Sequence, residues 1–206
     1  MTELANLDPA RAAVLTIDLQ NDFLHPEGAY GRAGKASPAL AALPARMRPV
    51  IDAVRDAGGV YLSAQFTLVP GPDGEPLIAP HLKALRPFLT RGDFLPGAFG
   101  HSLVDALAPA DGVVEKVAYS AFYQTRLEYL MRALRVEWLL LGGIVTNGGV
   151  ASTVRDAHLR ETPVVLLTDG CGAFDPAVHE ATLTSLGTVC RQMTCAEAIA
   201  LLEGAV

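Results

Sequence analysis

Residues 138–150 read WLLLGGIVTNGGV, in which an apolar run at residues 138–141 is followed by two pairs of glycines. A run that is apolar nearly throughout, rather than alternating, is typical of a strand covered on both faces of a parallel sheet. Helical spacing then predicts a helix over residues 147–159. Glycine lets backbone approach a ligand closely, and the first N–H groups of a helix favour an anion or an oxyanion. A tight helix–sheet junction that binds nothing remains the simpler alternative.

The same alternation of strand and helix recurs outward from this unit. Further apolar runs predict strands at residues 12–18, 59–64, 113–117 and 164–167, with a weaker sixth at 188–191. Periodicity and capping residues predict helices at residues 38–57, 121–134, 176–186 and 194–202. This order predicts the α/β class: a three-layer α/β/α sandwich, Rossmann-like, with a mostly parallel six-stranded sheet. Residues 67–101, rich in proline and glycine, predict a long loop with a short helix around residues 81–89.

Composition limits the partners that the chain can have. Its 206 residues are 50% hydrophobic and 18% charged, which indicates one globular domain over residues 1–206. A net charge of −6 without a basic patch argues against nucleic acid, and no apolar run approaches the roughly 20 residues of a membrane span. No signal peptide is expected, and three cysteines (Cys171, Cys190 and Cys195) without metal-type spacing favour a reduced, cytoplasmic location.

Two charged residues close predicted strands, where a doubly wound sheet binds its ligands. Asp18 ends the first strand, and Lys116 lies inside or just after the third. A partly desolvated carboxylate needs a partner or a proton, and a lysine is rarely buried unless it is paired. We therefore expect the two side chains to pair. Plainer roles remain open: Asp18 could cap a turn, and Lys116 could reach water from an edge strand.

Three segments in this order resemble the isochorismatase-like hydrolases. They are IDLQNDF at residues 17–23, EKVAYSAFYQTRLEYLMRAL at residues 115–134 and GGIVTNGGVASTVRDAH at residues 142–158. That family includes nicotinamidases, N-carbamoylsarcosine, ureidoacrylate and biuret amidases, and the isochorismatases proper. The resemblance covers nearly the whole chain. It implies a catalytic pair at Asp18 and Lys116, a nucleophile position at Gly149 and a cis peptide bond between Ile144 and Val145.

Gly149 departs from the family pattern, since most members carry a cysteine nucleophile there. Glycine has no side chain with which to attack, so the thioester route is closed at this position. The isochorismatases proper also carry glycine there and hydrolyse an enol ether with the family aspartate as proton donor. The pair Ala64-Gln65 is similar to one that holds a substrate-contacting glutamine in those enzymes, although Gln65 could instead satisfy loop backbone. The pair Thr146-Asn147 looks more like the amidases, so the sequence stands between the two subgroups.

The resemblance therefore predicts a hydrolase acting on a small carboxylate, enol ether or amide, with Asp18 as acid or base beside Lys116. Val145 and Gly149 N–H groups are expected to bind a carboxylate or oxyanion. The other predicted substrate-binding residues are Gln65, Phe23, Thr146, Gly148, Tyr119 and Phe122. The long loop is expected to shape the pocket through Phe66, Arg91 and Phe99.

The nicotinamidases bind a metal through an Asp-x-His pattern after the second strand, and the equivalent residues 63–65 offer neither ligand. His25, His81 and His101 are expected at the surface, so no cofactor or metal is expected. The family usually forms homodimers or homotetramers, so a homo-oligomer is expected.

Other interpretations of Gly149 stay open. The chain could be a catalytically silent member that binds a small molecule, or an amidase whose cysteine was replaced, by evolution or to trap substrate. Cys171, near the end of the fifth predicted strand, is the one thiol placed to act in its stead.

Overall fold

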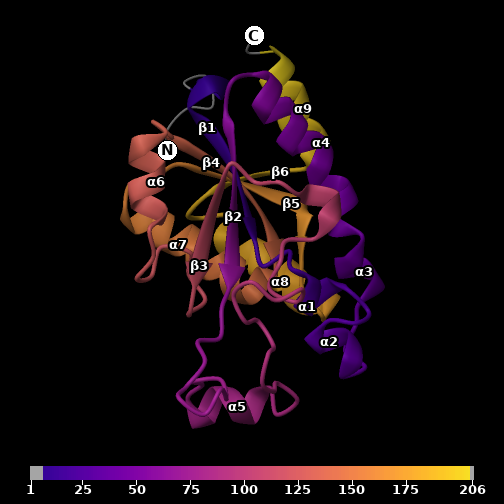
Figure 1. Ribbon diagram of the computed structural model, residues 1–206. Helices are drawn as coiled ribbons and strands as arrows, with labels where there is room; N and C mark the ends of the chain where they lie inside the picture. The colour runs from indigo at the N-terminus through magenta and orange to yellow at the C-terminus, as the bar shows by residue number, and fades with distance from the viewer. Residues whose placement is uncertain (1–6, 205–206) are drawn as a thin grey trace.

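The computed structural model describes residues 7–204 and confirms the three-layer α/β sandwich (Figure 1). One six-stranded sheet runs in the order β3-β2-β1-β4-β5-β6, and every neighbouring pair is parallel. The strands are β1 (Ala12–Ile17), β2 (Val60–Phe66), β3 (Gly112–Lys116), β4 (Trp138–Ile144), β5 (Val164–Gly172) and β6 (Arg191–Met193). The strand order reverses between β1 and β4, and such a switch point is where open α/β sheets bind ligands.

Helices cover both faces of the sheet. Helices α4 (Leu43–Asp56) and α9 (Cys195–Gly204) pack together on one face, preceded by α3 (Pro38–Ala41). The other face carries α6 (Leu127–Ala133), α7 (Ala151–Leu159) and α8 (Pro176–Leu186) (Figure 1). Short helices complete the chain: η2 (Pro9–Arg11), α1 (Asn21–Leu24), α2 (Ala29–Arg32), α5 (Pro80–Leu85), η3 (Asp105–Leu107) and η4 (Thr146–Val150). None of the helices between residues 7 and 204 is long and apolar enough to cross a bilayer.

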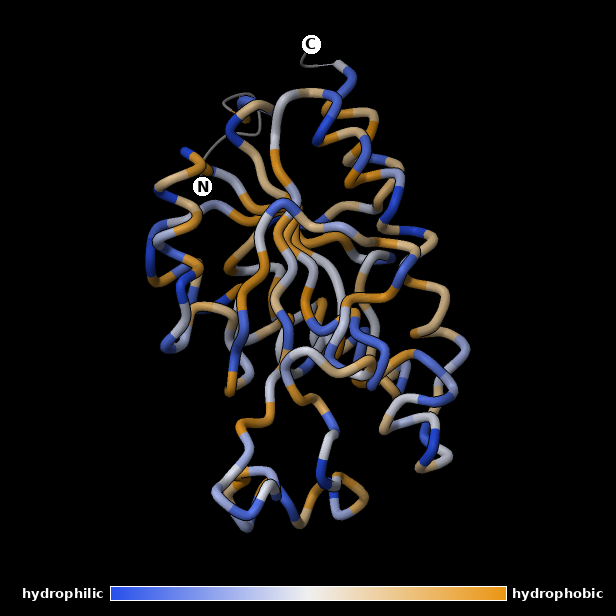
Figure 2. Tube along the Cα trace, viewed as in Figure 1, coloured by the Kyte–Doolittle hydropathy of each residue, from blue (hydrophilic) through white to orange (hydrophobic). Residues whose placement is uncertain are grey.

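Alternation along the central strands divides the core in two. Val14 and Leu140 join the cluster under α4 and α9, whereas Leu15 and Leu141 join the cluster under α6 and α7. Figure 2 shows the hydrophobic colour concentrated in the central strands, with hydrophilic stretches on the outer helices. Both faces of β1 and β4 are thus buried, which is why these strand sequences are apolar rather than alternating.

Helix ends follow the predicted capping signals. Asp175 accepts a hydrogen bond from the Ala177 N–H at 2.8 Å and so begins α8 at Pro176. At α9, the Thr194 N–H donates to Glu197 Oε2 at 2.7 Å, and the Glu197 N–H donates back to Thr194 Oγ1 at 3.2 Å. This reciprocal pair is the predicted capping box.

Several predicted elements have different bounds. Strand β5 extends to Gly172 rather than residue 167, and the helix predicted from residue 147 begins at Ala151 as α7, after η4. The helix predicted over residues 121–134 is only α6, because Ser120 Oγ and Thr125 Oγ1 accept from nearby N–H groups and hold residues 120–126 in turns. The helix predicted over residues 38–57 is divided into α3 and α4 at Ala42. The sixth strand begins at Arg191, three residues later than predicted.

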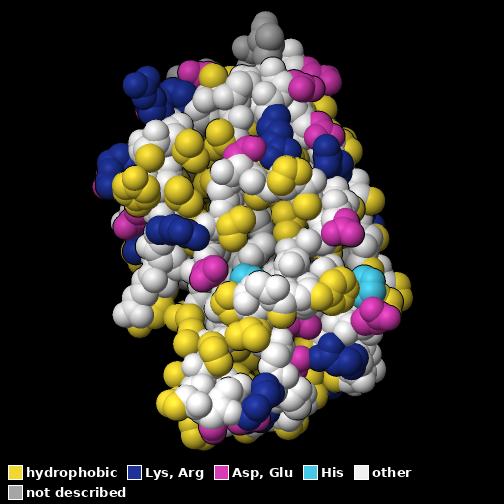
Figure 3. All heavy atoms as spheres, viewed as in Figure 1, with side chains coloured by type: hydrophobic (Ala, Val, Ile, Leu, Met, Phe, Trp, Pro, Cys, Tyr) yellow, Lys and Arg dark blue, Asp and Glu magenta, His cyan; other side chains and the backbone are white. Residues whose placement is uncertain are grey.

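The long loop over residues 67–101 leaves the carboxyl ends of the strands and carries α5 on a separate lobe (Figure 1). Hydrophobic side chains gather on this lobe (Figure 3), where Leu77 and Leu85 are exposed. Its base is anchored by Leu89 and Phe94, which pack against Tyr30 in a small buried cluster. The loop therefore forms one wall above the sheet edge where ligands are expected.

Candidate active site

Asp18 lies immediately after β1 in a left-handed conformation, with a φ of 58°. Its N–H donates to the Ala64 carbonyl at 2.9 Å. If the strand continued in an extended conformation, the Asp18 side chain would lie on the face of the sheet opposite to that of Ile17. A non-glycine residue at positive φ costs of order 1–3 kcal/mol and persists where the surroundings enforce it, often at a functional site.

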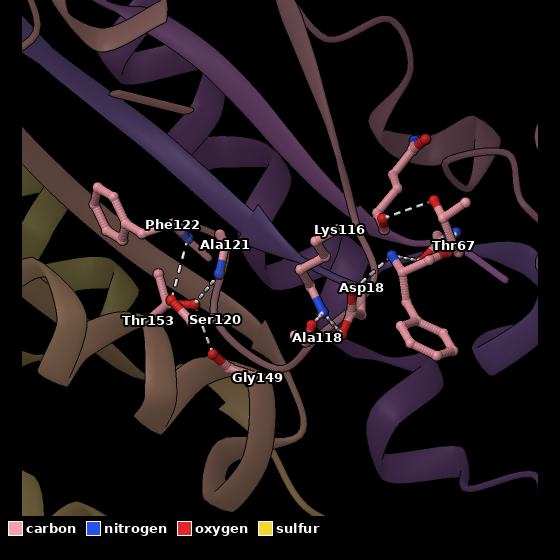
Figure 4. Close-up of polar contacts among 12 residues, drawn as sticks. Asp18, Thr67, Lys116, Ala118, Ser120, Ala121, Phe122, Gly149 and Thr153 are labelled. Atoms are coloured by element: carbon pink, nitrogen blue, oxygen red, sulfur yellow. Dashed lines mark hydrogen bonds and ion pairs between the residues drawn. The ribbon is translucent and has the colours of Figure 1, made fainter. Parts of the chain in front are cut away.

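The Asp18 carboxylate forms a buried ion pair with Lys116, the last residue of β3 (Figure 4). Lys116 Nζ donates to Asp18 Oδ2 at 2.8 Å and to the Ala118 carbonyl at 3.2 Å. Only 1% of Lys116 and 6% of Asp18 is exposed. The other carboxylate oxygen accepts from the Phe66 N–H at 3.0 Å, and the Phe66 ring lies 5.5 Å from Nζ. The predicted pairing is present, and Lys116 does not extend to water.

Burial decides the direction in which the pKa of Asp18 moves. Desolvation raises the pKa of Asp18 above its ordinary value of 3.8, because a dry site penalises the charged carboxylate. Lys116 and the Phe66 N–H pull the pKa down, but by less. The carboxyl group therefore holds its proton to a higher pH than an ordinary aspartate, which is the condition for a general acid.

The turn after β4 brings Gly149 against this carboxylate. The Ile144–Val145 peptide bond is cis, as the family resemblance implies, and η4 follows it. A Cβ placed on Gly149 would lie 3.2 Å from Asp18 Oδ2 and 2.8 Å from Ile17 Cγ2. The ends of β1, β3 and β4 thus meet at one point. A side chain at Gly149 would face Asp18, but only if Ile17 moved.

Thr153 fixes the carbonyl of that turn. Its buried hydroxyl donates to the Gly149 carbonyl at 2.7 Å and accepts from the Ala121 N–H at 3.0 Å, so it joins η4 to the loop after β3 (Figure 4). At the start of η4, Thr146 Oγ1 lies 2.8 Å from His179 Nδ1 on α8. The sequence analysis missed both Thr153 and His179. A threonine in the helix, four residues after Gly149, was a usable signal for the first, because its hydroxyl can bond to the preceding turn. No local pattern pointed to His179.

Aromatic rings line the side of the site next to Asp18. The Phe23 ring lies 4.9 Å from Tyr30 and 6.4 Å from Phe66, between centroids. On the opposite side, the Tyr119 ring would lie 3.6 Å from a Cβ placed on Gly148. The structure thus brings the predicted residues Phe23, Phe66, Tyr119 and Gly148 around the Asp18–Lys116 pair.

Two predicted binding residues lie elsewhere. Alternation along β2 places Gln65 on the opposite face of the sheet from Phe66. The Phe122 ring is buried in the cluster under α6 and α7, where the Arg160 guanidinium stacks on it at 4.9 Å. Neither side chain is brought to Asp18.

Two predicted loop residues are also directed away from the site. Arg91 pairs with the exposed Glu75 at 3.1 Å within the lobe. The exposed Phe99 ring packs edge-on against His25 at 5.0 Å. A different arginine of the same loop, Arg86, faces the site instead, since its Nε donates to Tyr30 Oη at 3.0 Å. Sequence reasoning missed Arg86 and Tyr30, because only the path of the loop brings them together.

Cys171 and His101 are buried packing groups, whereas His81 is exposed as predicted. Burial raises the pKa of Cys171 to about 12, so its thiol stays protonated near neutral pH and is a poor nucleophile. The expectation that His101 lies at the surface is wrong: it is buried, its Nε2 lies 2.8 Å from Thr67 Oγ1, and burial lowers its pKa. Across residues 7–204, no three His, Cys, Asp or Glu side chains gather as a metal site would require.

Comparison with known proteins agrees with the fold. Residues 12–198 match the model of the isochorismatase domain. The chain is 34% identical over 194 residues to the ureidoacrylate amidohydrolase RutB of Methylobacterium radiotolerans, covering 88% of this chain and 75% of the relative. The structure of a cysteine hydrolase from Pseudomonas syringae pv. phaseolicola is 26% identical with a TM-score of 0.84, covering 97% of this chain and 96% of the other. An N-carbamoylsarcosine amidase from Thermoplasma acidophilum shares the fold at 24% identity and a TM-score of 0.69, covering 90% and 96% of the two chains.

Proposed function

Because this chain belongs to the isochorismatase family of hydrolases, we propose that it hydrolyses a small enol ether that bears a carboxylate, with Asp18 as the acid and without a covalent intermediate. One observation carries the proposal. The place where a cysteine would stand holds Gly149, and the nearest reactive group to that place is the Asp18 carboxyl, 3.2 Å from a Cβ built there. A site without a nucleophile but with a buried acid suits a bond that breaks after protonation.

Thiol chemistry has no support at this site. Gly149 offers no side chain, and the buried Cys171 keeps its proton because its pKa is about 12. An enol ether needs no nucleophile from the protein. Protonation of its terminal vinyl carbon gives an oxocarbenium ion, to which water adds.

Asp18 and Lys116 have separate tasks in this scheme. Asp18 donates its proton to the vinyl carbon, and water then adds to the carbon that bears the ether oxygen. The hemiketal collapses to a ketone and an alcohol, and the proton released by the added water returns to Asp18. Lys116 fixes the carboxyl through its 2.8 Å contact and stabilises the carboxylate that forms after proton transfer. In this proposal, the N–H groups of the turn at Val145 and Gly149 hold an anionic oxygen of the substrate.

Amide hydrolysis is the second candidate, favoured by the 34% identical relative, which is a ureidoacrylate amidohydrolase. In that reaction, ionised Asp18 would take a proton from a water molecule standing where a cysteine thiol stands in other members. The two reactions need opposite protonation states of Asp18. The raised pKa of that carboxyl favours the ether reaction.

Product labelling separates these possibilities. The purified protein is incubated in deuterium oxide with 2-alkoxyacrylates as enol ethers and with ureido acids as amides, before and after treatment with iodoacetamide. The proposal predicts ketone formation with one deuterium in the new methyl group, unchanged by the alkylating agent. If ammonia is released from the ureido acids and no ketone is formed from the enol ethers, the proposal is wrong and the protein is an amidase. Tight binding of either class without turnover would indicate a silent binding protein and overturn both reactions.

A further inference from the structure

Arg86 is bound by a tyrosine beside the site. It follows α5 on the lobe, and its Nε donates to Tyr30 Oη at 3.0 Å. The Tyr30 ring is buried and stacks on Phe174 with centroids 5.5 Å apart and an angle of 6° between the ring planes. Tyr119 lies close enough to the same guanidinium to help raise its pKa. The guanidinium is thus anchored by Tyr30, which belongs to the body of the protein and not to the lobe.

Both tyrosines lie beside the site that contains Asp18. Tyr119 comes three residues after Lys116, and its ring lies against Gly148 of the turn. Tyr30 contacts Phe23, which forms the aromatic side of the site with Phe66. Arg86 also lies close enough to Asp18 for its positive charge to lower the pKa of that carboxyl, although burial has the larger, opposite effect. Arg86 therefore lies near the acid, on the side of the site that Tyr30 borders.

The charge of Arg86 lacks a carboxylate partner. Six arginines within residues 7–204 form ion pairs, namely Arg11, Arg32, Arg48, Arg55, Arg91 and Arg160, whereas Arg86 forms none in that range although it is half-buried. Its tyrosine partner stays neutral, because burial raises the pKa of Tyr30 above 10.0. A guanidinium has five N–H donors, and the Tyr30 contact uses one nitrogen. The fork that remains matches a carboxylate in shape and charge.

We propose that Arg86 recognises the carboxylate of the substrate and so makes the site selective for small anionic molecules over their neutral analogues. This inference rests on the proposed function only for the position of the reacting group. Anion recognition also connects binding with chemistry. When a carboxylate neutralises Arg86, the arginine no longer lowers the pKa of Asp18, so the bound substrate strengthens the hold of Asp18 on its proton.

The test compares an acid with its amide. Binding of 2-methoxyacrylate and of 2-methoxyacrylamide is measured by calorimetry for the wild type, Arg86→Gln and the matched control Arg91→Gln. Arg91 lies on the same loop but pairs with the exposed Glu75. We expect Arg86→Gln to weaken binding of the acid about 10- to 100-fold and to leave the amide nearly unchanged. Arg91→Gln should behave as the wild type, and Arg86→Lys should recover part of the loss, since it keeps the charge without the fork.

The difference between acid and amide binding separates recognition of the carboxylate by Arg86 from a structural role in which Arg86 only anchors the lobe. An equal loss for acid and amide in Arg86→Gln, no preference for the acid in the wild type, or no binding of the acid by the wild type would overturn the proposal. The measurement does not require turnover. An unreactive protein that still prefers the acid through Arg86 would refute the hydrolysis proposed above and support this inference.

Discussion

Removing Lys116 while Asp18 remains leaves a carboxylate in a dry site. Lys116→Met is the informative change, because methionine keeps an unbranched apolar chain and removes only the charge and its hydrogen bonds. Lys116 is 1% exposed, and its Nζ holds both Asp18 and the Ala118 carbonyl. Breaking a buried pair by removing one partner costs about 3–5 kcal/mol. For a chain of 206 residues, that loss corresponds to a fall in Tm of roughly 6–20 °C.

The loss should depend on pH, with a sign fixed by Asp18. Without Lys116, the pKa of Asp18 in the folded protein rises further above its ordinary value of 3.8. The unfolded state then gives up the proton at a lower pH than the folded state, so stability falls as pH rises from about 4 to the folded pKa. Lys116→Met should therefore lose its full 3–5 kcal/mol at pH 8 and clearly less at pH 5.

Urea unfolding measures this directly, with fluorescence of the single tryptophan, the buried Trp138, as the probe. The double variant Asp18→Asn/Lys116→Met is the control, since it removes both charges and should regain most of the stability at pH 8. A loss under 1 kcal/mol, or an equal loss at pH 5 and pH 8, would refute the assignment of a buried ion pair.

Three further predictions concern the turn and its neighbours. Thr153→Val should cost about 1–3 kcal/mol in urea unfolding, because two buried backbone groups lose their partner, whereas Thr153→Ser should cost much less. Gly149→Cys should cost about 1–3 kcal/mol through the 2.8 Å approach to Ile17 Cγ2, and adding Ile17→Leu, which lacks that branch, should relieve it; an unchanged midpoint for the single variant would contradict the close contact. Cys171→Ala should retain wild-type turnover, since that thiol stays protonated, and a tenfold loss would instead implicate it in the reaction.

The strands and the two charged residues at their ends were predictable, because their signals are local. A nearly continuous apolar run, such as the one that forms β4, is typical of a buried parallel strand. The carboxyl ends of parallel strands lie together, so Asp18 and Lys116 were expected close to each other. Lys116 was expected to need a partner because the run before it is typical of a central strand. That strand, β3, is instead an edge of the sheet, and Lys116 is nevertheless buried beside Asp18.

Residues on loops were not predictable in this way. Arg86 and Arg91 lie five positions apart in one loop, and only the folded path of the chain directs the first to Tyr30 and the second to Glu75. His101 was expected at the surface, yet the loop returns it to Thr67 under the sheet edge. The sequence states which groups are available there, but tertiary packing decides which of them meet.

The central claim is that Asp18 is the acid of a site without a nucleophile. It is tested most directly by kcat/KM for 2-methoxyacrylate as a function of pH, in the wild type and in Asp18→Asn. Asparagine keeps the shape and an oxygen for the Phe66 N–H and Lys116 but has no proton to give. We expect the wild-type value to fall as pH rises through the raised pKa of Asp18, and the variant to be slower by about 10²–10⁴-fold. A variant that turns over as fast as the wild type would contradict the account.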